Sequence, residues 1–135
     1  MRIETRREGS TSILSLAGEL DASNYTYLVD AARDAKTQGV RAMVVDLARL
    51  TYMGSAGLVA LHSVGLILAG IEPPGGEAGF DAMLQYSSDV PGHRFREVLK
   101  LASVPPLVER VLSRTGMAAL FEQHPDVESA VAAVG

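Results

Sequence analysis

The amino-acid sequence predicts an α/β fold: a four- to five-stranded mixed sheet with about four α-helices. Segments with the two-residue period of strands alternate along the chain with longer segments that have the apolar pattern of helices. Residues 40–47 (V-R-A-M-V-V-D-L) are apolar on both faces, as in a central strand covered from both sides. The order β-β-α-β-α-β-α-β-α therefore predicts a mainly parallel sheet with right-handed crossovers and one antiparallel pair at its start.

The first half of the chain contains a hairpin, a helix, the central strand and a second helix. Residues 2–6 and 11–17 alternate around a turn-like segment, which predicts the hairpin. A helix with an apolar stripe from Tyr25 to Ala35 follows, with Asp21 and Ser23 as candidate N-caps. After the strand at 40–47, residues 55–69 form a second helix. This helix is apolar on nearly all sides and is expected to be the most buried.

The second half begins with an insertion at about residues 71–95. This segment is rich in Pro, Gly and Ser and too poor in apolar residues to offset the entropy of ordering it. We expect it to be flexible, dispensable for folding and attached at the pole opposite Ser55. A strand at 98–102 follows, then a helix that begins at Pro105-Pro106 and stops at Gly116. Leu120-Phe121 is the expected last strand, and Asp126 is expected to cap a C-terminal helix.

Composition narrows the function. The 135 residues fit a single domain, 1–135. There are no cysteines, and the three histidines are about thirty residues apart, so we expect no metal site and no cofactor. A net charge of -4 and a pI of about 5.3 disfavour nucleic-acid binding. No apolar stretch is long enough to span a membrane and no signal peptide is evident, so the expected location is the cytoplasm.

The most informative stretch is the turn between the central strand and the second helix. Gly54-Ser55-Ala56-Gly57 directs the Ser55 hydroxyl to a helix N-terminus, where an oxyanion such as a phosphate is stabilised. Asp21 ends the preceding strand of the sheet. In parallel sheets the functional pole lies beyond the carboxyl ends of the strands, so Asp21 and Ser55 should meet there.

Four segments resemble a known family in the order in which they occur. They are G-E-L-D at 18–21, V-V-D-L at 44–47, Y-M-G-S-A-G-L at 52–58 and V-P-P-L-V-E-R-V-L-S-R-T-G-M at 104–117. Together they resemble a STAS domain of the anti-sigma factor antagonist family. The resemblance covers nearly the whole chain except the insertion.

The resemblance implies a cytoplasmic protein that binds an anti-sigma factor, which is often itself a serine kinase. The kinase phosphorylates the serine that opens the second helix, here Ser55, and a phosphatase reverses this. The expected partner surface comprises Asp21, Asn24, Tyr52, Gly54, Ser55, Ala56 and Gly57. Two positions differ from the family pattern: Gly54 replaces the usual acidic residue or serine, and Ala48 replaces a frequent serine.

Structural interpretations of the same residues stay open. Ser55 and Asp21 are each suited to a helix N-cap, and Gly57 to a tight strand-to-helix turn. Tyr52 and Met53 are also suited to the core. The sequence G-S-A-G lacks the G-x-S-x-G spacing of a hydrolase elbow, and no acid adjoins His124 in the sequence, so we expect no catalysis. The alternatives to a phosphorylated antagonist are a STAS scaffold that is never phosphorylated and a sensor of a small ligand or nucleotide.

Overall fold

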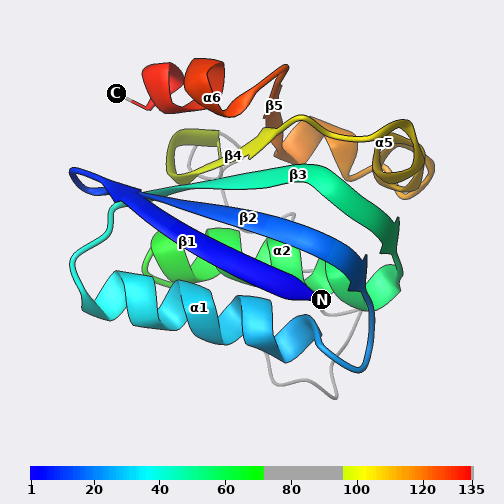
Figure 1. The fold of residues 1–135 in the computed structure, drawn as a ribbon, viewed down its shortest axis with the longest axis horizontal. Coiled ribbons are helices and arrows are strands. Elements are labelled where there is room, and N and C mark those ends of the chain that lie inside the picture. Colours follow the sequence, from blue (N-terminus) through cyan, green and yellow to red (C-terminus); the bar gives the residue numbers. More distant parts are fainter. Residues whose placement is uncertain (72–95, 135) are drawn as a thin grey trace.

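The computed structural model describes residues 1–71 and 96–134 (Figure 1). The predicted insertion at about 71–95 lies, apart from Ile71, outside the described residues, so its expected flexibility stays a prediction. In chain order, the elements are β1 (Arg2–Glu8), β2 (Thr11–Leu20), α1 (Tyr25–Thr37), β3 (Ala42–Met53), α2 (Ser55–Leu68), β4 (Leu99–Ala102), α5 (Pro106–Arg114), the 3-10 helix η1 (Ala118–Leu120), β5 (Glu122–His124) and α6 (Val127–Ala133). Residues 96–98 are helical and lead into β4.

The five strands form one mixed sheet in the order β1-β2-β3-β4-β5. β1 pairs with β2 in antiparallel orientation, and all other neighbours are parallel. This arrangement confirms the predicted α/β class, the hairpin at the start and the central position of β3. The carboxyl ends of β2, β3 and β4 consequently lie along one edge of the molecule.

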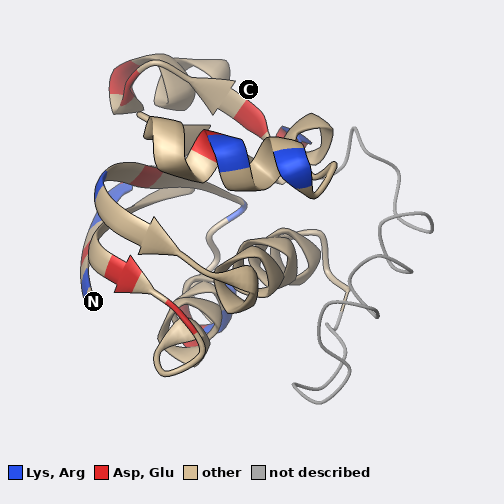
Figure 2. Ribbon diagram, turned by 90° about the vertical axis from the view of Figure 1, so that its right-hand side faces the viewer, with Lys and Arg blue, Asp and Glu red and all other residues tan. Residues whose placement is uncertain are grey.

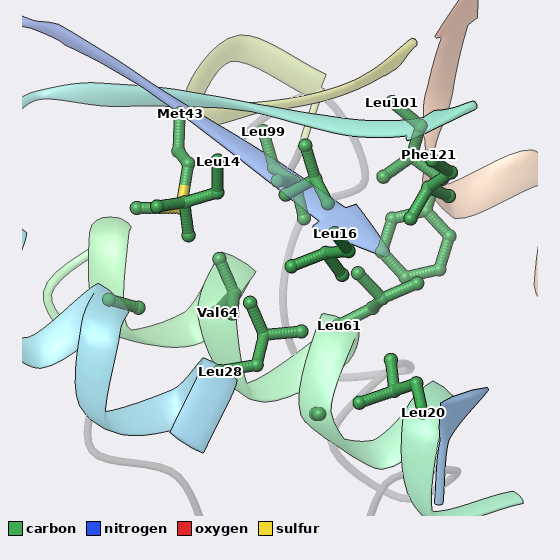
Figure 3. Close-up of a cluster of buried hydrophobic side chains, with 14 of the residues drawn as sticks. Leu14, Leu16, Leu20, Leu28, Met43, Leu61, Val64, Leu99, Leu101 and Phe121 are labelled. Carbon is green, nitrogen blue, oxygen red and sulfur yellow. The ribbon is translucent and has the colours of Figure 1, made fainter. Parts of the chain in front are cut away.

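The main core lies between the sheet and helices α1, α2 and α5. Leu14, Leu16 and Met43 extend from the strands toward Leu28 of α1 and Leu61 of α2 (Figure 3). α2 is buried on almost every side, which makes it the most buried helix of the described chain, as its sequence predicts.

The opposite face of the sheet has a much smaller core under α6 (Figure 1). Ile13, Val44 and Ala102 come from β2, β3 and β4, and Ala130 comes from α6. The Asp126 side chain caps α6 as predicted, because its Oδ1 accepts a hydrogen bond of 2.7 Å from the N–H of Ser129. α6 reaches Arg6 and Glu8 in the second half of β1. It leaves the part of this face near the start of β1 uncovered, where polar side chains of β1, β2 and β3 lie.

Several strand boundaries differ from the sequence prediction, the end of β3 and the last strand among them. β3 continues beyond Leu47 to Met53, because it stays paired with β2 as far as Leu20. The last strand is Glu122–His124 rather than Leu120-Phe121. Phe121 is instead buried in the main core immediately before this strand, and Leu120 ends η1.

The extension of β2 and β3 depends on a register shift at Gly18. The pairing of β2 with β3 slips between Ser15 and Ala17 and again between Gly18 and Glu19. Gly18 has φ of 99°, a conformation that side-chain-bearing residues rarely adopt. The glycine therefore permits the irregularity that carries β2 to Leu20, next to Met53.

Candidate functional site at the carboxyl pole

We define the carboxyl pole as residues 19–28, 52–58 and 103–109, the strand ends, loops and first helical turns beyond β2, β3 and β4. Figure 2 views the molecule from the side where β2 and β3 end. The N–H of Gly54 donates to the carbonyl of Leu20 over 3.0 Å, which joins the first two segments directly. The loops that contain Asp21 and Ser55 therefore lie side by side at one pole, as the sequence predicts.

Ser55 is the first residue of α2, and its side chain is exposed. The N-cap position belongs to Gly54, and no side chain makes a capping hydrogen bond at this helix start. The interpretation of Ser55 as a plain N-cap is therefore wrong. Its hydroxyl lies at the positive end of a 14-residue helix, and among the described residues it makes no capping hydrogen bond that would need to be broken.

The two glycines beside Ser55 have different roles. A Cβ atom on Gly57 would lie 2.7 Å from Cγ of Met53 and 3.1 Å from Cδ2 of Leu20, so Gly57 lets α2 approach the strand ends closely. Gly57 lies inside α2, so its small size is needed for packing. The prediction that it permits a tight strand-to-helix turn is wrong. The three atoms nearest to a Cβ on Gly54 would all belong to the Tyr52 side chain, with 3.3 Å to the hydroxyl oxygen. Gly54 has φ of −89°, which any residue can adopt.

The loop between β2 and α1 is organised by Asp21 and Asn24. Asp21 Oδ1 accepts from the N–H of Ser23 over 2.9 Å, and the Ser23 hydroxyl donates to the same oxygen. These hydrogen bonds, the hydroxyl first, lower the pKa of the Asp21 carboxyl below its ordinary value. Asn24 Oδ1 accepts from the N–H of Asp21 over 3.0 Å, and its Nδ2 donates to the carbonyl of Glu19 over 2.8 Å.

This loop corrects the predicted caps of α1. The N-cap position is Asn24, not Asp21 or Ser23. Asp21 contributes through its backbone, since its carbonyl accepts from the N–H of Tyr25 over 3.0 Å. Asp21 and Asn24 both help to fix the loop, and the half-buried Asp21 still presents a negative charge at the pole.

Exposed apolar side chains are concentrated at this pole. Tyr52 is 47% exposed, so its assignment to the core is wrong, whereas Met53 is 3% exposed and belongs to the core. Tyr27, 62% exposed in the first turn of α1, and Leu107, 41% exposed in the first turn of α5, were not predicted as site residues. Both lie off the buried stripes of their helices, which is the sequence signal that could have identified them.

The charges of the carboxyl pole are all negative. Among its residues the charged side chains are those of Glu19, Asp21 and Glu109, and none of its three segments contains Lys or Arg. The junction of β3 with α2 carries no charge at all, as Figure 2 shows by its tan colour. The basic residues of α5 follow the first turn of that helix. A phosphate on Ser55 would therefore meet helix N–H groups and no cation from these segments.

The described residues show neither a catalytic group around Ser55 nor a metal site. His124 lies on β5, where its Nε2 is 3.3 Å from Glu122 Oε2, and β4 separates β5 from β3. In residues 1–71 and 96–134, no three histidine or acidic side chains are grouped as metal ligands. Within the same ranges, no helix has the length and apolarity needed to cross a membrane.

Comparison with known families identifies the domain. The family described as "Mlab, STAS domain" matches residues 3–70, which is half of the chain and includes β1 to α2. The chain belongs to the STAS domain family. No curated protein sequence matches it significantly.

Solved structures share the fold of this STAS domain. An anti-sigma factor antagonist from Mycobacterium paratuberculosis is 20% identical, with 98% of this chain and 92% of that chain covered and a TM-score of 0.65. Unphosphorylated SpoIIAA, an anti-sigma factor antagonist, is 17% identical over 96% of this chain and 93% of its own, with a TM-score of 0.62. The phosphorylated form of SpoIIAA from Bacillus is 18% identical over 99% and 100%, with a TM-score of 0.63. At these identities the likeness shows the fold alone.

Proposed function

We propose that this STAS domain, formed by residues 1–135, is an anti-sigma factor antagonist controlled by phosphorylation of Ser55. The single observation that carries the proposal is the Ser55 hydroxyl, which is exposed at the start of the buried helix α2 and makes no capping hydrogen bond in the described structure. The similarity to SpoIIAA, whose structures exist in unphosphorylated and phosphorylated forms, supports the same role. In this proposal the partner is an anti-sigma factor with serine kinase activity, and a phosphatase restores the hydroxyl.

The environment of Ser55 suits a switch that acts on a partner rather than on the fold. Phosphorylation adds about -1.5 to -2 charges to a residue that is already in solvent. The helix N-terminus stabilises this charge by roughly 0.3–1 kcal/mol, so the protein itself tolerates the modification. A partner that covers the hydroxyl must instead desolvate a dianion, which costs several kcal/mol unless the partner supplies a cation.

The surface around Ser55 supports binding of a protein. Tyr27, Tyr52 and Leu107 expose apolar surface, and aromatic side chains are enriched among the residues that dominate protein interfaces. The acidic groups of the pole favour a partner with basic residues at the rim of its interface. The docking residues we propose are the predicted set, Asp21, Asn24, Tyr52, Gly54, Ser55, Ala56 and Gly57, together with Tyr27 and Leu107. Gly57 is buried and acts by allowing the close approach of α2.

The direct test is affinity capture from native cytoplasm with wild type, Ser55→Ala and Ser55→Asp. We expect Ser55→Asp to lose the partner and Ser55→Ala to keep it. The matched control is Ser10→Asp, which places the same charge on an exposed serine in the β1–β2 turn, at the other end of β2. Capture that is unchanged in Ser55→Asp, or lost equally in Ser10→Asp, would contradict the proposal.

Phosphorylation is tested by incubating the protein with the captured kinase and locating phosphate by mass spectrometry. Phosphate on Ser55, and none in Ser55→Ala, is the expected result. Gly54 and Ala48 depart from the usual residues at their positions, and this favours the second candidate, a STAS scaffold that binds its partner without phosphorylation. Stable capture of a partner with no phosphate on Ser55 would support that candidate, whereas loss of binding on adding a nucleotide or metabolite would support a ligand sensor.

The proposal assigns no catalytic step to this chain and places it in the cytoplasm. A nucleophilic serine needs a base within hydrogen-bond reach, and among the described residues Ser55 has no side-chain hydrogen bond to a base. A hydrolytic activity that is abolished by Ser55→Ala would overturn this assignment.

A further inference from the structure

Strand β1 carries alternating charges along the outer edge of the sheet. Arg2, Glu4, Arg6 and Glu8 are all exposed and share one face, because each pairs with a residue of β2 on the side that includes Ile13 of the α6 core. Neighbouring charges on this face pair along the strand, with 3.0 Å between Arg2 and Glu4 and 4.0 Å between Arg6 and Glu8. No described strand pairs with the outer edge of β1.

The backbone of β1 presents a regular set of free hydrogen-bonding groups. Glu8 pairs with Thr11 across the two-residue turn of Gly9 and Ser10, so the backbone groups of Glu8 point toward β2. Since the direction alternates along an antiparallel strand, the N–H and C=O groups of Ile3, Thr5 and Arg7 point outward. A further strand can pair with β1 through these three residues.

The order of charges selects one antiparallel pairing of β1 with a second β1. A two-fold axis at Thr5 places Arg2 opposite Glu8 of the second copy and Glu4 opposite Arg6, so that all four facing pairs on the charged face are attractive. A shift by two residues in either direction places Glu4 or Arg6 opposite its own counterpart and makes every facing charge pair repulsive. A shift by four residues leaves only two attractive pairs. Charges on an edge strand usually prevent pairing, but this order favours the antiparallel register with four attractive pairs over its neighbouring registers.

The axis at Thr5 also agrees with the hydrogen-bonding pattern of the strand. Thr5 and its counterpart form a hydrogen-bonded pair, because both point their backbone groups outward. Glu4 and Arg6 then form the non-hydrogen-bonded pairs, in which facing side chains approach more closely. The attractive charges thus occupy the positions where a charge contributes most.

We propose that β1 is a self-association edge, through which two copies of this chain join their five-stranded sheets about a two-fold axis at Thr5. The interface is isologous, as two-fold symmetry requires. An edge of seven residues is small compared with the surface that stable dimers bury, so the dimer forms only at high concentration. It leaves Ser55 free, because Ser55 lies at the end of β3 and the start of α2 rather than on β1.

The test uses two charge-reversal variants and their mixture in analytical ultracentrifugation. Glu4→Arg alone faces arginine with arginine, and Arg6→Glu alone faces glutamate with glutamate, so each should self-associate at least about tenfold more weakly than wild type. Mixed in equal amounts, the two variants face opposite charges at both positions and should form a heterodimer with about the affinity of wild type. Replacing Arg2, Glu4, Arg6 and Glu8 together by the opposite charge is the matched control, and it should preserve the dimer.

Amide hydrogen exchange gives an independent readout of the register. With rising concentration of wild type, the amides of Ile3, Thr5 and Arg7 should gain protection while those of Glu4 and Arg6 stay unchanged. A protein that is monomeric at concentrations on the order of 1 mM would overturn the proposal. So would a dimer that neither single variant weakens, or a mixture of the two variants that fails to associate. Melting curves that match wild type show that the variants are folded.

Discussion

In the body of α2, residues 58–68, every side chain except that of Val59 is buried, whereas in its first turn Ser55 is exposed and Ala56 is half-buried. The body is surrounded by strands and by α1, and it contains a buried histidine, His62. The first turn extends past the sheet at the carboxyl pole. The buried body fixes the position of the helix. The helix in turn holds the Ser55 hydroxyl in solvent, where an enzyme that modifies it can reach it.

The largest expected effect is a change in the body of α2. Leu61→Ala removes a side chain that is completely buried in the main core, so it should lower the free energy of unfolding by about 2–5 kcal/mol. Urea denaturation measures the loss. Leu107→Ala is the matched control: this leucine is 41% exposed at the pole, and its truncation should change stability by no more than about 0.5 kcal/mol. Equal losses in the two variants would contradict the distinction between body and pole.

The buried histidine should make the stability of the protein depend on pH. Burial lowers the pKa of His62 to about 4 from its ordinary value of 6.5, so between these values the unfolded chain binds a proton that the folded protein does not. Above pH 6.5 the histidine is neutral in both states, and the stability of the fold is at its full value. As the pH drops from 6.5 toward 4, protonation stabilises the unfolded chain and the free energy of unfolding falls. The total loss is roughly 3 kcal/mol.

The contribution of His62 is isolated by comparing wild type with His62→Leu in urea at pH 7 and at pH 4.5. The free energy of unfolding should fall more steeply in wild type than in the variant. Carboxylates whose pKa is lowered in the fold, such as those of Asp126 and Glu122, titrate in both proteins and cancel in the difference. Parallel pH profiles would show that burial of His62 has no such effect.

A smaller effect separates the two glycines at the start of α2. Gly57→Ala places a methyl group 2.7 Å from Met53, and the cost of overpacking, about 1–3 kcal/mol, exceeds the gain in helix propensity. The nearest neighbour of Gly54→Ala is the exposed Tyr52 ring, which can move, so we expect a change of no more than about 0.5 kcal/mol. Thermal unfolding of the two variants checks this order. Stabilisation by Gly57→Ala, as in an exposed helix, would refute the close approach.

The fold could be predicted from the sequence wherever a long periodic pattern determines the element. The apolar residues of α2 and of residues 40–47 form such patterns. Because Ser55 lies between these two segments in the sequence, its place at the start of the helix could be predicted as well. The six residues by which β3 continues beyond the predicted strand, 48–53, could not be assigned this way, because the register shifts near Gly18 change which of them are buried. A pattern search has no access to the pairing of two strands.

The last strand and the exposed residues of the pole escaped prediction for other reasons. β5 consists of Glu122, Gln123 and His124 and has no apolar periodicity, and the ammonium group of the buried Lys100 on β4 contacts the Glu122 carboxylate. Tyr27 and Leu107 are apolar residues in solvent, and a sequence reading assigns apolar residues to the core by default. Exposure at a shared pole becomes evident only when the three strand ends are placed together.

The smallest expected effect on stability is that of Ser55→Asp. Its side chain makes no capping hydrogen bond that the substitution would remove, and it is exposed, so the new charge stays hydrated. The helix N-terminus attracts the carboxylate, whereas Asp21 lies in the joined loop and opposes it, so the net change should be within about 0.5 kcal/mol of wild type. Urea denaturation at low and high salt measures this change. Ser55→Asp that unfolds at much lower urea would mean that the hydroxyl has a structural role, and loss of the partner in the capture experiment would then reflect the fold rather than the switch. A variant as stable as wild type that no longer binds assigns the loss to the charge at the interface.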